Sequence, residues 1–229
     1  MDKQTFLQAA AERMTEYAPN DDVQRQLNGL RMVVAVGPTG AGKTSIIDRS
    51  GIPHVLVDVT RAPRGEEEDG VDYHFRTDYE QLLKEIDNGE FVQYIIHPNG
   101  EFYGTKASSY PTHGACALAI LSSAVPYFKR LGFGTLVVVF IVPPDYDEWM
   151  RRVNTHSDAD REARLEEAKI SFEYALSDPH CLLLLNDRLA TASQEFRAIG
   201  HGAGMVAEQP EAKKTIESLL LRLTAELST

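Results

Sequence analysis

Glycine, lysine and hydroxyl side chains are spaced for phosphate binding between residues 37 and 44. The run Gly-Pro-Thr-Gly-Ala-Gly-Lys-Thr fits the pattern G-x-x-x-x-G-K-[ST] at every fixed position. Its glycines let the backbone curl so that several N–H groups point at one phosphate, and a helix that begins at Lys43 adds its positive end. We expect Lys43 to reach the β- and γ-phosphates of a nucleoside triphosphate and the Thr44 hydroxyl to bind the accompanying Mg²⁺.

The surroundings of this run favour a phosphate loop over a glycine-rich turn that matches by chance. An apolar stretch typical of a buried strand precedes it at residues 31–36, and a helical pattern follows to about Ser50. The residues expected to contact the triphosphate are Gly37, Pro38, Thr39, Gly40, Ala41, Gly42, Lys43, Thr44 and Ser45.

A second group of residues could bind a phosphate dianion. Arg61 and Arg64 lie three residues apart in a segment without helical periodicity, and Tyr73 follows nine residues later. Two guanidinium groups in this spacing can form a fork for a phosphate, and the tyrosine can add a hydroxyl donor. On these residues alone, a solvated charged loop is the more common alternative.

Further motifs follow the phosphate loop in a fixed order. They are T-R-A-P-R with D-G-V-D-Y-H-F (residues 60–75), G-E-F (89–91), G-E-F-Y-G-T (100–105), Pro143-Pro144 before a helix with Arg151-Arg152, and Asn186-Asp187. In this combination the sequence resembles guanylate kinases over residues 31–199. The resemblance implies a nucleoside monophosphate kinase, which converts ATP and a nucleoside monophosphate to ADP and a diphosphate.

The resemblance also implies roles for individual residues. Lys43, Arg152 and Arg164 are the implied catalytic residues, and the two arginines belong to a lid that closes on the triphosphate. Glu67 is implied to orient the phosphate-binding arginines. The residues implied to bind the monophosphate substrate are Arg61, Arg64, Glu67, Tyr73 and Tyr103 near its phosphate, and Gln93 and Thr105 near its base.

Some positions depart from the family's pattern. Val57 stands where a serine faces the guanine carbonyl, and Gln93 stands where a glutamate accepts from guanine N1–H and the 2-amino group. Residues 120–122, Ile-Leu-Ser, replace a D-x-D pair near the base and magnesium, and His156 replaces a lid arginine, although Arg161 lies nearby. A carboxylate only accepts hydrogen bonds whereas an amide also donates, so these changes are expected to weaken guanine preference.

Two interpretations of the departures stay open. In one, the acceptor base is not guanine, and a pyrimidine or a modified nucleotide suits an amide side chain. In the other, the alignment is displaced in this region and Asp58 or Ser122 supplies the missing interaction.

Other classes of function compete with the kinase. A guanylate-kinase-like nucleotide- or protein-binding module that has lost catalysis is favoured by the missing D-x-D pair and opposed by the intact loop with Lys43. A P-loop GTPase is disfavoured because no N-K-x-D motif occurs. A kinase acting on a modified nucleotide or a base in DNA is a further alternative.

Strands that alternate with helices are expected to position these residues. They predict an α/β layered sheet. The resemblance to guanylate kinases implies a three-layer P-loop kinase fold with a parallel core sheet, a small mixed α/β nucleotide-binding lobe and a lid. The strands are expected at 31–36, 55–57, 91–96, 116–121, 136–142 and 182–185, and the helices at 3–17, 23–30, 43–50, 78–88, 124–131, 145–153, 161–176, 189–199 and 213–227. The expected organisation is an N-terminal helical extension (1–30), a kinase-like domain (31–205; core 31–57 and 114–199, nucleotide lobe 58–113, lid about 152–166) and a C-terminal helix (206–229).

Composition bounds the remaining possibilities. The chain has 229 residues and a formal charge of −11, which disfavours a nucleic-acid partner. Residues 65–90 hold ten acidic and two basic side chains, so −8 of that charge lies in the proposed acceptor lobe. With no long apolar run, no secretory signal and two isolated cysteines, we expect a cytoplasmic protein without a membrane partner and with buried, reduced thiols. The apolar face of the last helix could pack within the chain or form a homodimer.

Overall fold

The protein is described from a computed structural model that covers residues 1–97, 99–154, 161–203 and 210–228. The chain forms two compact units, which are considered one at a time. One comprises residues 1–30, 55–114 and 131–134, and the other comprises residues 31–54, 115–130 and 135–229. Residues 155–160 of the predicted lid, which include His156, and residues 204–209 lie outside the described residues.

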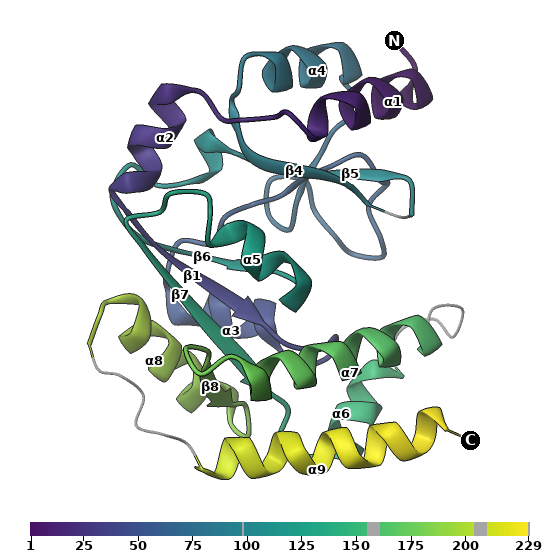
Figure 1. Cartoon of the computed structure of the whole chain (residues 1–229), viewed down its shortest axis with the longest axis vertical. Coiled ribbons are helices and arrows are strands. Elements are labelled where there is room, and N and C mark those ends of the chain that lie inside the picture. Colours follow the sequence, from purple (N-terminus) through teal and green to yellow (C-terminus); the bar gives the residue numbers. More distant parts are fainter. Residues whose placement is uncertain (98, 155–160, 204–209, 229) are drawn as a thin grey trace. The chain divides into compact units, whose positions relative to one another are not determined.

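A four-stranded sheet forms the centre of the second unit, which we call the core unit (Figure 1). Strand β1 pairs in parallel with β7, and β7 pairs in parallel with β8. The two central strands, β1 and β7, are rich in valine because side chains on both faces are covered. In the order in which they lie across the sheet, they are β6 (Gly114–Ala119), β1 (Leu30–Val36), β7 (Thr135–Val142) and β8 (Leu182–Leu185).

Helices cover both faces of this sheet. On one face, Ile47 of α3 and Phe196 of α8 pack against Val139 and Ile141. On the other face, Phe140 contacts Phe172 of α7. The helical segments of the core unit are α3 (Lys43–Ser50), η2 (Ser122–Ala124), α5 (Val125–Phe128), α6 (Tyr146–Val153), α7 (Arg161–Ser177), α8 (Leu189–Gly200) and α9 (Pro210–Leu227).

The last helix packs within the core unit. Helix α9 lies beside α7 (Figure 1), and Ile216, Leu219 and Leu223 are buried. The apolar face predicted for the C-terminal segment is therefore covered in large part by the chain itself.

The other unit, which we call the acceptor unit, is built on a mixed sheet. Its central strands β2 and β5 are antiparallel, β4 pairs antiparallel with β5, and β3 pairs in parallel with β2. The strands are β3 (His74–Phe75), β2 (Asp58–Val59), β5 (Glu101–Lys106) and β4 (Phe91–His97), in that order. The helical segments are α1 (Lys3–Met14), α2 (Asp21–Asn28), α4 (Tyr79–Asp87) and η1 (Ala107–Ser109).

The N-terminal segment packs onto the acceptor unit. Helix α1 lies beside α4 (Figure 1), and Phe6 joins Leu82, Phe91 and Phe102 in one buried cluster. The Tyr17 hydroxyl donates to the Phe91 carbonyl at 2.6 Å. Residues 1–30 thus complete the core of this unit.

The predicted α/β fold with a parallel core sheet is confirmed, and most elements lie within a few residues of their predicted bounds. The strand predicted at 55–57 is wrong, because the ladder in this region forms at Asp58–Val59 instead. Asp78 stands at the N-cap position of α4, but its carboxylate binds Arg76 and makes no cap hydrogen bond. Strand β5 was not predicted, since its glycine and polar residues weaken the strand pattern.

Two further expectations concern cysteines and membranes. Cys116 and Cys181 are buried free thiols, and burial raises the pKa of each to about 12. Among the described residues, no helix has the length and apolar character needed to cross a bilayer.

Candidate functional site

The predicted phosphate loop joins the carboxyl end of β1 to α3 in the core unit. Gly37 and Gly42 have φ values of 138° and 94°, which side-chain-bearing residues rarely adopt. A Cβ atom at Gly37 would lie 2.7 Å from the Ile141 carbonyl oxygen, and one at Gly42 would lie 2.4 Å from Asn186 Nδ2. Glycine is therefore required at both positions by conformation and by space.

Two side chains from distant parts of the sequence brace the loop. Asn186 Nδ2 donates to the Ala41 carbonyl at 2.8 Å, and Trp149 Nε1 donates to the Thr39 carbonyl at 2.8 Å. The Trp149 indole is also buried. Its hydrogen bond to the loop was not predicted, because sequence spacing cannot show which backbone carbonyl an indole reaches.

The ammonium group of Lys43 binds backbone carbonyls of the phosphate loop itself. It donates to the carbonyl oxygens of Gly37 at 2.6 Å and Pro38 at 2.9 Å. Burial lowers the pKa of Lys43 to about 8, and the Glu167 carboxylate acts in the opposite direction. Thr44 and Ser45 are exposed at the start of α3.

Glu167 on α7 is a charged neighbour that the motifs did not reveal. Its Oε1 atom is buried and has no hydrogen-bond partner among the described residues. Burial raises the pKa of this carboxyl, while the charge of Lys43 lowers it. An acidic residue in an amphipathic helix carries no motif, so only the fold associates it with Lys43.

The predicted lid arginines belong to helices of the core unit. Arg152 on α6 donates through Nε to Glu148 Oε1 at 2.8 Å. A Cβ atom built at Gly40 would lie 3.4 Å from Arg152 Cβ, so this arginine lies against the phosphate loop. Arg164 lies on the first turns of α7, one turn before Glu167.

The segment expected to align with a D-x-D pair carries no carboxylate. Leu121 is 41% exposed at this position, and Ser122 is buried at the start of η2. The structure thus retains the loop and its lysine while this neighbouring segment lacks acidic groups.

In the acceptor unit, Arg61 and Glu67 form a two-pronged ion pair. The Arg61 guanidinium donates to both Glu67 carboxylate oxygens, at 2.6 and 2.8 Å, and lies over the Tyr73 ring at 4.6 Å. Glu67 also accepts from the Arg64 backbone N–H at 2.8 Å. Hydrogen bonding from Arg61 lowers the pKa of Glu67, so the carboxylate stays ionised and holds the arginine segment in place.

The two residues expected near the base lie opposite each other on adjacent strands. Gln93 on β4 is paired with Thr105 on β5, and Gln93 Nε2 donates to Thr105 Oγ1 at 3.4 Å. Thr105 is 0% exposed and Gln93 is 9% exposed. Thr105 also accepts from the Tyr110 hydroxyl at 2.9 Å, a contact that the sequence did not predict. Tyr103, two residues before Thr105, lies edge-on to His97.

Asp58, considered as a substitute base-binding residue, is engaged elsewhere in the acceptor unit. It is 2% exposed and pairs with Arg76, which also binds Asp78 and Glu85. Burial raises the pKa of Asp58, and its Oδ1 atom has no hydrogen-bond partner among the described residues.

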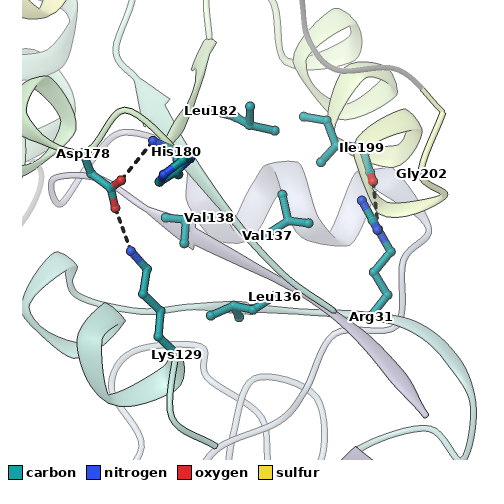
Figure 2. A pocket seen from close by; sticks show the side chains of 10 residues that line it. All are labelled: Arg31, Lys129, Leu136, Val137, Val138, Asp178, His180, Leu182, Ile199 and Gly202. Carbon is teal, nitrogen blue, oxygen red and sulfur yellow. Dashed lines mark hydrogen bonds and ion pairs between the residues drawn. The ribbon is translucent and has the colours of Figure 1, made fainter. Parts of the chain in front are cut away.

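A hollow of about 400 Å³ opens elsewhere in the core unit (Figure 2). It lies at the amino ends of β7 and β8, whereas the phosphate loop leaves the carboxyl end of β1. Its floor is apolar, and its rim charges are engaged: Lys129 pairs with Asp178 at 2.9 Å, and Arg31 donates to the Ile199 carbonyl at 3.3 Å. No motif residue lines this hollow, which separates it from the candidate site.

Sequence comparison matches this chain to a family of known proteins. The family model described as Guanylate kinase matches residues 29–199. The chain is 34% identical over 176 residues to the guanylate kinase of Salinibacter ruber, and the aligned region covers 72% of this chain and 92% of that relative. It is 32% identical over 174 residues to the guanylate kinase of Thermotoga maritima, with coverage of 71% and 82%.

The fold has a counterpart among solved structures. The crystal structure of guanylate kinase from Anaplasma phagocytophilum matches 77% of this chain and 87% of its own, with a TM-score of 0.56 and 22% identity. At that identity the match concerns the fold. The family model and the relatives above 30% identity carry the assignment further: the chain belongs to the guanylate kinase family.

Proposed function

We propose that the protein transfers the γ-phosphoryl group of ATP to a nucleoside monophosphate. The observation that supports this proposal is that the chain carries two separate groups of residues suited to phosphate: the loop with Lys43, and the Arg61–Glu67–Tyr73 cluster. An acceptor phosphate oxygen is already anionic, so it needs no strong base to attack the γ-phosphorus. As that bond forms, the bond to the bridging oxygen of ADP breaks.

The residues of the phosphate loop fit ATP and Mg²⁺. A backbone in which glycine is sterically required, with a lysine ammonium inside it and a hydroxyl at the helix start, is the donor set that a triphosphate needs. Mg²⁺, when bound with ATP, would neutralise charge on the β- and γ-phosphates. Lys43, Arg152 and Arg164 would neutralise the charge that moves with the phosphoryl group, and Thr44 would contribute a ligand to the metal.

In the acceptor unit, Arg61, Arg64, Tyr73 and Tyr103 would bind the phosphate of the monophosphate. Glu67 would hold Arg61 without neutralising the whole cluster, because the exposed Arg64 side chain contributes a second cation. The proposed acceptors are GMP, dGMP or a nucleotide with another base.

Replacement of one side chain tests the phosphoryl transfer. Lys43→Met retains the length of the side chain but removes its charge, and we expect turnover with ATP and any accepted monophosphate to fall by at least about 100-fold. Lys129→Met, which removes a lysine that lines the distant hollow, is the matched control and should retain activity. Equal activity of the two variants would contradict the proposed role of the loop.

The identity of the base is tested at Gln93. Two adjacent donors, as on guanine, satisfy a carboxylate better than an amide, since the amide presents only one acceptor. We therefore expect a small ratio of kcat/KM between GMP and IMP, which lacks the 2-amino group, and we expect Gln93→Glu to raise this ratio about tenfold. A strong preference of the unmodified protein for GMP over IMP, unaltered in the variant, would show that Gln93 does not determine the base.

A nucleotide-binding module without catalysis is the second candidate. It is favoured by one observation, the exposed Leu121 and buried Ser122 where acidic residues were expected. This candidate predicts that ATP and GMP bind in calorimetry while no diphosphate is formed.

A further inference from the structure

We propose that Tyr110 is a positioning residue that holds Gln93 through Thr105 and so helps to set the choice of nucleotide base. The proposal rests on the proposed function in one respect, namely that Gln93 faces the base. Every contact that carries it lies within the acceptor unit.

The first step is the pair of hydrogen bonds on Thr105. Tyr110 Oη lies 2.9 Å and Gln93 Nε2 lies 3.4 Å from Thr105 Oγ1. Thr105 is 0% exposed and Tyr110 is 5% exposed, so water does not compete for these contacts. A threonine hydroxyl has two acceptor positions and one proton, so the two neighbours engage its acceptor capacity fully. Thr105 thereby serves as a buried link between Gln93 and Tyr110.

The second step is the hold on Tyr110 itself. Its ring packs against Phe133 with centroids 6.0 Å apart, and its backbone N–H donates to the Ala107 carbonyl at 3.1 Å. Gln26 on α2 approaches the same segment from the N-terminal part of the chain. Gln26 Nε2 lies 3.3, 3.2 and 3.1 Å from the carbonyl oxygens of Ala107, Tyr110 and Pro111.

These contacts form one chain of interactions, which we call the Gln26 relay: Gln26, the 107–111 segment, Tyr110, Thr105 and Gln93. A side chain that hydrogen-bonds to the edge of a base must hold its donor and acceptor atoms in fixed positions to discriminate between bases. The relay supplies that constraint from helix α2, which gives the N-terminal segment a role in substrate choice as well as in packing.

Tyr110→Phe is the primary test, because it removes one hydroxyl and keeps the ring against Phe133. Loss of this hydrogen bond should raise KM for the preferred monophosphate about five- to tenfold, with KM for ATP unchanged. It should also shift the kcat/KM ratio between GMP and AMP, since a loosened Gln93 discriminates less. Tyr94→Phe is the matched control: Tyr94 is buried in the same unit, but its hydroxyl donates to the Ala10 carbonyl at 3.0 Å.

Gln26→Met tests the outer end of the relay. Gln24→Met is its control, because among the described residues the Gln24 side-chain amide donates to the Pro19 carbonyl of its own segment and makes no hydrogen bond to the relay. Gln26→Met should shift the GMP:AMP ratio in the same direction as Tyr110→Phe, whereas Gln24→Met and Tyr94→Phe should leave it within about twofold. A general loss of folding would lower the melting temperature and the apparent kcat for both monophosphates, and it would leave the GMP:AMP ratio unchanged.

Two results would overturn the proposal: equal effects of Tyr110→Phe and Tyr94→Phe on the GMP:AMP ratio, or a ratio unchanged in Tyr110→Phe. The same variants are compared by calorimetric binding of GMP and AMP, so that the relay is judged apart from turnover. Absence of diphosphate formation by the unmodified protein would count against the proposed function alone. If the ratio of GMP affinity to AMP affinity is the same in Tyr110→Phe as in the unmodified protein, that result would count against the relay.

Discussion

In each unit, the candidate functional residues interact through buried or partly buried charged groups. Arg61 and Glu67 hold each other in the acceptor unit, and Lys43 and Glu167 influence each other's pKa in the core unit. Motif spacing singled out Lys43 and Arg61, and the resemblance to guanylate kinases implied a role for Glu67. Neither revealed Glu167 or Tyr110, because their roles depend on neighbours that are distant in sequence and brought together only by the fold.

The pH dependence of Glu67 yields a prediction at this scale. Arg61 lowers the pKa of Glu67 in the folded chain, so the unfolded chain binds more protons between the folded and unfolded pKa values. The stability that this carboxylate contributes is therefore present above its unfolded pKa and lost as pH falls through the folded one.

We expect Glu67→Gln to lower the free energy of unfolding by about 1–3 kcal/mol at pH 7, since it replaces the two-pronged ion pair with a single hydrogen bond from the Arg61 guanidinium to an uncharged amide oxygen. Urea denaturation from about pH 7 down to about pH 3 measures how this difference shrinks as Glu67 becomes protonated, first in the unfolded chain and then in the folded one. Glu66→Gln, an exposed neighbour, is the control. A difference that stays constant with pH would mean that folding does not lower the pKa of Glu67.

Among the elements, the strands and long helices followed from the sequence, while the short connections did not. Strand β8 begins and ends where its apolar run predicted, and Asp145 caps α6 by accepting from the Glu148 N–H at 2.8 Å. Asp78 had an equally good sequence context, yet Arg76 takes its carboxylate. A cap and an ion pair compete for the same oxygens, and sequence alone cannot rank them.

The strands and helix of the acceptor unit are joined by a buried ionic network that the sequence did not predict. Arg76 binds Asp58, Asp78 and Glu85, and Glu85 also binds Lys106 at 2.7 Å. Removing the Arg76 guanidinium leaves the buried Asp58 carboxylate without its paired cation and leaves Glu85 paired with Lys106.

We expect Arg76→Met to lower the free energy of unfolding by about 3–5 kcal/mol, measured by urea denaturation at pH 7. The double variant Asp58→Asn with Arg76→Met should recover part of this loss, because it removes one of the uncompensated charges. A loss below about 1 kcal/mol in the single variant would show that water already compensates these carboxylates.

At the scale of the whole molecule, the charge of −11 is unevenly distributed along the chain. Ten acidic side chains lie within residues 65–90, yet the proposed phosphate-binding residues Lys43, Arg61, Arg64, Arg152 and Arg164 are all cationic. Each unit contributes some of these cations. Small groups of cations within each unit of an acidic chain suit a nucleotide better than a long polyanion.

The direct test of the whole account is to identify the products. The unmodified protein is incubated with ATP, Mg²⁺ and each of GMP, dGMP, IMP, AMP, CMP and UMP, and phosphorus NMR follows the phosphate groups. The account predicts that ADP and the nucleoside diphosphate of at least one acceptor appear in equal amounts, and that neither appears with Lys43→Met. Release of inorganic phosphate with ADP, or binding without any diphosphate, would contradict it.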